Sequence, residues 1–135
     1  MIECVFRPVQ EWPGDKTPRE KRRSGAAFQS GFTRTPLQDQ PISVAGHHGV
    51  TARVEIGPGV ESGRHVHPGE EFGYVLEGAL QLEIDGRALQ TFKTGDVFFV
   101  PAGVVHNGRN TGSVKTTLIG TYIVESGKPL SAPAK

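Results

Sequence analysis

The chain has 135 residues, a length suited to one domain that buries roughly two thirds of its unfolded surface. Its 18 glycines and 10 prolines indicate frequent chain reversals, so a turn-rich all-β domain is the expected class. The net charge of +1, from 15 basic and 14 acidic residues, predicts no general attraction to nucleic acid or to an anionic membrane. Cys4 is the only cysteine, which excludes an internal disulfide and a cysteine metal cage.

The N-terminal residues do not read as a secretory signal, because no basic start is followed by a long apolar stretch. Apolar runs elsewhere are far shorter than the ~20 residues that span a bilayer. We therefore expect a soluble, cytoplasmic protein.

Residues 1–45 are expected to form an extended N-terminal arm. Five prolines recur in it, and each removes a backbone donor that a long helix or a central strand would need: Pro8, Pro13, Pro18, Pro36 and Pro41. Ala26–Gln29 and Phe32–Thr33 could still add as edge strands. The arm is predicted to cover a sheet edge of its own domain or of a partner in a homodimer.

The arm carries the densest charge run of the sequence, Lys16–Arg23, with five basic residues and one acidic residue. A phosphate-binding or nucleic-acid patch is one interpretation of such a run. A solvated linker is the favoured one, because no aromatic residues are interleaved and no recognition helix accompanies it.

Residues 46–126 are predicted to fold as strand after strand, followed by a C-terminal tail over 127–135. Val50–Ile56 and Leu80–Ile84 alternate apolar and polar residues, and Asp85-Gly86 after the latter is typical of a two-residue hairpin. A second turn is expected at Lys93–Asp96. The other predicted strands are Phe72–Glu77, Val97–Val100, which reads as buried on both faces, and Thr116–Val124. Such spacing predicts a β-sandwich or a barrel.

Two short windows contain candidate metal ligands. His65 and His67 are two apart, so in a strand their imidazoles project to the same face. Glu71 follows a Pro-Gly bend and is placed to add a carboxylate, and His106 follows a tight reversal at Pro101–Gly103. Imidazoles suit Zn, Cu, Fe or Ni, and a carboxylate extends the range toward Mn.

The two windows resemble the two signature motifs of the cupin superfamily at every motif position. The first motif is met by Gly59, His65, His67, Glu71 and Gly78, and the second by Gly95, Pro101, Gly103, His106 and Asn110. The resemblance covers roughly residues 46–125. It implies an all-β, double-stranded β-helix (jelly-roll) barrel, here with the N-terminal arm outside it.

The cupin resemblance also implies that His65, His67, Glu71 and His106 are metal ligands. The cofactor would be one divalent transition-metal ion, either Fe, Mn, Ni or Zn. The glycines, Pro101 and Asn110 of the motifs correspond to turn-forming positions. Three further residues are weaker candidates for catalysis: Arg53 as a contact to an anionic substrate, and Tyr74 and Tyr122 as proton-transfer groups.

The resemblance leaves the reaction open, because this fold hosts many chemistries. The first hypothesis is an Fe(II)- or Mn(II)-dependent dioxygenase that acts on a small oxygenated organic molecule. The alternatives are a non-redox isomerase, lyase or decarboxylase with the same ligands, and a metal-bearing binding or sensory module without turnover. The expected partners are a small-molecule substrate or ligand and a second copy of the chain.

Overall fold

The computed structural model describes residues 30–135, and it forms ten β-strands in two five-stranded sheets. Cys4, Lys16–Arg23 and Ala26–Gln29 lie outside the described residues. The first sheet has the order β1 (Phe32–Pro41), β2 (His47–Ile56), β9 (Thr116–Glu125), β4 (Glu71–Glu77) and β7 (Val97–Val100). The second has the order β10 (Ala132–Pro133), β3 (His65–Val66), β8 (His106–Arg109), β5 (Ala79–Ile84) and β6 (Gln90–Lys93).

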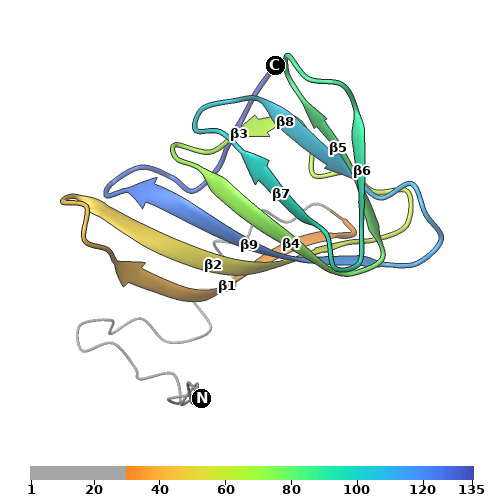
Figure 1. Ribbon diagram of the computed structural model, residues 1–135, viewed down its shortest axis with the longest axis horizontal. Coiled ribbons are helices and arrows are strands. Elements are labelled where there is room, and N and C mark those ends of the chain that lie inside the picture. The colour runs from red at the N-terminus through yellow and green to blue at the C-terminus, as the bar shows by residue number, and fades with distance from the viewer. Residues whose placement is uncertain (1–29) are drawn as a thin grey trace.

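All paired strands are antiparallel, and consecutive strands often cross from one sheet to the other. Figure 1 shows the long strands β1, β2, β9 and β4 side by side, with the shorter strands β3, β8, β5 and β6 forming the opposing layer. This arrangement is the double-stranded β-helix that the motifs predict.

The core lies between the two sheets and is built from the inward-facing residues of alternating strands. In β5, for example, Leu80, Leu82 and Ile84 are buried and their neighbours are half-buried, which is the period-two pattern of a strand with one covered face. The main cluster is completed by residues of both sheets: Phe32, Val54, Ile56, Val75, Phe98, Val100 and Leu118. A smaller cluster, with Val50, Ala52, Tyr122 and Val124, lies beside it.

The first strand of the sheet falls inside residues 1–45, the range expected to be an arm. β1 pairs with β2 along nearly its whole length, from Phe32 opposite Ile56 to Pro41 opposite His48. It is an edge strand, which tolerates the donors missing at Pro36 and Pro41, and the register shifts between Pro36 and Gln38. The range expected as an arm therefore contributes an edge strand to the first sheet.

The prediction that Val97–Val100 is buried on both faces is wrong for the described chain. Phe98 and Val100 point into the core, but Val97 is 69% exposed and Phe99 42% exposed. β7 is the last strand of its sheet, and its apolar outer face continues that of β4. The sequence pattern shows that these residues are apolar but does not show whether other residues bury them.

The predicted two-residue hairpin at Asp85-Gly86 is also wrong in its details. A turn does form there, with the Arg87 amide donating to the Ile84 carbonyl and with positive φ at Gly86. However, Asp85 keeps negative φ, and the β5–β6 ladder ends at Leu82 opposite Gln90. The Asp85 amide donates instead to the Val105 carbonyl, so this end of β5 follows β8 and the loop to β6 is longer.

Within residues 30–135 the strands account for all regular structure, and no helix there is long and apolar enough to cross a membrane.

Candidate metal centre

The four residues expected to be metal ligands meet at one place between the two sheets. His65 is the first residue of β3 and stands opposite His106, the first residue of β8, in the strand register. His67 follows β3 directly, and its carbonyl accepts a hydrogen bond from the Gly103 amide at 2.9 Å. Glu71 begins β4 in the other sheet. All four side chains are buried.

Each of the three imidazoles is oriented by a hydrogen bond from Nδ1 to a backbone carbonyl. His65 donates to Gly63 at 2.7 Å, His67 to Leu130 at 2.7 Å and His106 to Val104 at 3.0 Å. A carbonyl only accepts, so Nδ1 must carry the proton. The neutral ring then has its lone pair on Nε2, which is the arrangement that a metal-binding histidine needs.

The Nε2 atoms of His67 and His106 are buried and have no hydrogen-bond partner among the described residues. The nearest oxygen is Oε2 of Glu71, at 3.2 Å from His67 Nε2 and 3.3 Å from His106 Nε2. An ion pair at these distances requires a protonated ring, and neither contact is aligned as a hydrogen bond. Because buried polar atoms without a partner are rare in folded proteins, two of them at one place indicate a position where a ligand binds.

The pKa shifts of two members of the cluster favour a neutral imidazole at His65 and an ionised carboxylate at Glu71. Burial lowers the pKa of His65 from 6.5 to about 3, and the neighbouring His106 adds to the effect. Burial alone raises the pKa of Glu71, but its contacts with His106 and His67 outweigh that effect and the net pKa lies below the ordinary value. Both groups are therefore in their metal-binding protonation states at neutral pH.

The residues fit a divalent transition-metal ion. Ligand nitrogens of His65, His67 and His106 all lie within 4.8 Å of one another. Imidazole nitrogens bound at about 2.1 Å to one ion lie at most about 4.2 Å apart, so a pair at the full 4.8 Å must approach by about 0.6 Å or more to share one ion. Three neutral nitrogens and one carboxylate match the borderline ions from Mn to Zn and do not single out one of them.

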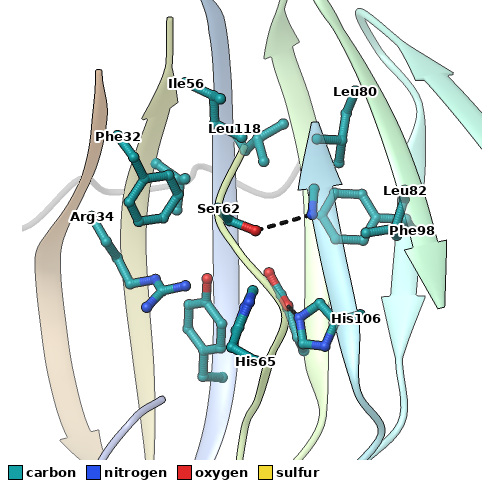
Figure 2. A pocket seen from close by; sticks show the side chains of 14 residues that line it. Phe32, Arg34, Ile56, Ser62, His65, Leu80, Leu82, Phe98, His106 and Leu118 are labelled. Carbon is teal, nitrogen blue, oxygen red and sulfur yellow. Dashed lines mark hydrogen bonds and ion pairs between the residues drawn. The ribbon is translucent and has the colours of Figure 1, made fainter. Parts of the chain in front are cut away.

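A pocket opens beside the cluster and has one polar side and one apolar side. In Figure 2 the apolar side chains, including Ile56, Leu80 and Leu118, lie on one side, and Arg34, His65 and His106 lie on the other. The cavity volume is ≈ 30 Å³, room for one or two water molecules or a very small ligand. The apolar side limits access of bulk water to the cluster.

Of the three weaker candidates, only Tyr122 lies at the pocket. It is 1% exposed, and its ring lies 4.7 Å, centroid to centroid, from the ring of His67. Arg53 is exposed on β2, because its neighbours Ala52 and Val54 are the residues that face inward. Tyr74 is 43% exposed on the outer face of β4.

Two parts of the site were missed by the sequence analysis. Arg34 lines the pocket from β1, in the range expected as an arm, and no local pattern distinguishes it from the other arginines of that range. The Leu130 carbonyl that accepts from His67 belongs to the expected tail. A backbone acceptor leaves no signal in a sequence.

The family model for the cupin domain matches residues 52–127, more than half of the chain. The chain is a member of the cupin family. It is 31% identical over 106 residues to protein SchB of Streptomyces halstedii, covering 78% of this chain and 70% of SchB. It is 36% identical over 76 residues to germin-like protein subfamily 2 member 1 of Arabidopsis thaliana, covering 53% of this chain but only 35% of that relative.

Solved structures of other proteins share the fold. One is a double-stranded β-helix protein from Klebsiella pneumoniae subsp. pneumoniae, with a TM-score of 0.64, 19% identity, and coverage of 80% of this cupin and 88% of that chain. Another is oxalate oxidase in complex with the substrate analogue glycolate, with a TM-score of 0.62 and 24% identity. The match covers 78% of this cupin and 56% of the oxalate oxidase chain. At these identities the likeness establishes the architecture.

Proposed function

We propose that this cupin is a metal-dependent oxidoreductase, a dioxygenase that inserts both atoms of O₂ into a small oxygenated organic substrate. Its ligands are His65, His67, Glu71 and His106, and its ion is Fe(II) or Mn(II). The cupin family and the three-histidine cluster support a divalent metal site in general. This support does not distinguish between reactions, so the dioxygenase activity is what we propose.

The orientation of the three imidazoles is the main support for this proposal. Every imidazole of the cluster donates its Nδ1 proton to a backbone carbonyl, so every Nε2 lone pair is available to bind an ion. A structural role for three buried histidines would be expected to use both nitrogens. Three imidazoles and one carboxylate also leave open positions on an ion with five or six ligands, which is what separates a catalytic site from a closed structural one.

The residues around the ion would have separate tasks. When bound, the ion supplies Lewis acidity and, if it is redox-active, the electrons for O₂ chemistry. Glu71 offsets part of the charge of the ion, and the carbonyls of Gly63, Val104 and Leu130 hold the rings in place. The apolar side of the pocket keeps competing water away from the substrate.

A non-redox isomerase, lyase or decarboxylase is the second candidate, and the position of Tyr122 favours it. Burial raises the pKa of Tyr122 above its ordinary value of 10, and the negative charge of Glu71 raises it further. The phenol is therefore protonated at neutral pH and stands beside His67. A neutral hydroxyl in that place can donate a proton to a carbanion or enolate formed from the substrate and so give the product.

Turnover under air separates these reactions from a binding or sensory module. The purified protein is incubated with libraries of hydroxy acids, oxo acids and catechols, with Fe(II), Mn(II) or Ni(II) restored, while O₂ uptake and product masses are recorded. O₂ uptake coupled to a product heavier by two oxygen atoms supports the dioxygenase, and an anaerobic isomer or loss of CO₂ supports the second candidate. Unchanged libraries with every metal contradict both enzymes.

A homodimer is also proposed, with the outer face of β4 and β7 as its contact. Phe72 and Phe99 pack there with ring centroids 5.1 Å apart, next to Tyr74 and Val97. Their exposed fractions, between 42% and 69%, are high for large apolar side chains that lie together. A second copy would cover them and the free edge of β7.

A further inference from the structure

Arg34 and Tyr122 bring two polar groups to the pocket that the metal site does not use. Nε of Arg34 and the hydroxyl of Tyr122 are both buried, and neither has a hydrogen-bond partner among the described residues. None of the ion pairs among residues 30–135 includes Arg34. Buried donors of this kind are costly unless a ligand pairs with them.

The two groups lie close to each other and to the metal cluster. The guanidinium carbon of Arg34 is 5.6 Å from the centroid of the Tyr122 ring and 5.5 Å from that of Phe32, so aromatic rings hold it in place. Figure 2 shows the side chain reaching from β1 into the pocket, on the side of His65. Tyr122 in turn stands against His67.

The charge of the pocket favours the binding of an anion. The charges of Glu71 and Arg34 cancel, and an imidazole that donates from Nδ1 and binds an ion through Nε2 adds no charge, so a bound divalent ion would leave a net charge of about +2 to be balanced. A guanidinium is suited to bind a carboxylate or an enolate through charge-assisted hydrogen bonds. The other side of the pocket is apolar and accepts only the uncharged part of such a molecule.

We infer that Arg34 and Tyr122 form a binding site for the charged oxygen of a small organic anion, a carboxylate or an enolate, beside the metal centre. This inference rests on the proposed function for the role of the anion as substrate. The site itself is defined by residues of β1 and β9 and not by the metal ligands. The inference narrows the proposed substrate class from any small oxygenated molecule to a small organic anion.

The test compares acetate with the neutral and nearly isosteric acetamide by titration calorimetry of the metal-loaded protein. We expect acetate to bind at least about 10-fold more tightly than acetamide, and Arg34→Gln to weaken acetate binding by about 10-fold or more. Tyr122→Phe should weaken it by a smaller factor, because it removes one neutral hydrogen bond. Arg53→Gln, on the next strand but facing outward, is the matched control and should leave acetate binding unchanged.

Metal content and fold are measured on the same samples. Arg34→Gln should keep the full metal content and the circular dichroism of the wild-type protein, and Arg34→Lys, which keeps the charge, should give intermediate acetate binding. Equal binding of acetate and acetamide by the wild-type protein, or wild-type acetate binding by Arg34→Gln, would overturn the inference. If the protein takes up no metal, the proposed function fails, and the same comparison on the metal-free protein still decides whether Arg34 selects anions.

Discussion

At the scale of single residues, the depressed pKa of His65 makes the metal-free protein sensitive to acid. The unfolded chain binds a proton on this imidazole below pH 6.5, but the folded protein does so only below about pH 3. The free energy of unfolding therefore decreases as the pH falls from 6.5 toward 3, by up to about 1.4 kcal/mol per pH unit for one proton. Glu71, whose pKa is also lowered, adds a loss of the same sign below pH 4.5.

Urea unfolding of the metal-free protein at several pH values measures this slope. His65→Gln should flatten it between pH 6 and pH 4, because the proton uptake of the unfolded chain at this position is gone. Val114→Gln, at an exposed position without a titratable group, is the control and should keep the wild-type slope. An equal slope in His65→Gln would contradict the buried neutral imidazole.

The meeting of the four proposed ligands at one place could be predicted from the sequence, and the groups that orient their side chains could not. His65, His67, Glu71 and His106 sit at fixed distances from turn residues, and those turns set the strand register that brings them together. Arg34 and the Leu130 carbonyl reach the site only through tertiary pairing, of β1 with β2 and of β10 with β3. No spacing within the sequence encodes either contact.

At the scale of elements, the segment that contains Leu130 takes part in the proposed metal centre. Leu130 packs against the cluster of Val50, Tyr122 and Val124, and its carbonyl accepts the Nδ1 proton of His67. Deletion of residues 129–135 should weaken metal binding by about 10–100-fold, the usual effect of losing a hydrogen-bond partner of a metal ligand. Competition with a chelator of known affinity measures it.

Leu130→Ala is the matched control for that deletion, because it removes the packing and keeps the carbonyl. It should lower the melting temperature and leave metal affinity close to that of the wild-type protein. If the point variant weakens metal binding as much as the deletion does, packing and not the hydrogen bond orients His67.

Close packing between β4 and β7 depends on a glycine. A Cβ on Gly73 would lie 2.0 Å from the Phe98 ring, which is a core side chain, so Gly73→Ala must displace that ring. We expect a loss of about 1–3 kcal/mol in the free energy of unfolding. Gly49→Ala in β2, where the nearest atom would be 3.5 Å away, should change stability far less. Similar losses for both variants would show that the ring is not tightly held.

At the scale of the whole molecule, the exposed apolar face of β4 and β7 predicts self-association. Sedimentation analysis should show a dimer for the full chain. Val97→Glu should give a folded monomer, since it places a charge in the middle of the contact. Val114→Glu changes a valine outside the strands that is 59% exposed, against 69% for Val97, and should leave the dimer intact. A wild-type monomer would contradict the proposed contact.

The central claim is that the chain holds a divalent metal through His65, His67, Glu71 and His106. Elemental analysis of protein purified without an affinity tag or added metal tests it most directly. We expect about one divalent transition-metal ion per chain in the wild-type protein. A His106→Ala variant should lose most of this metal and still have the circular dichroism of a β-domain. Full metal content in folded His106→Ala, or no metal in the wild-type protein, would contradict the claim.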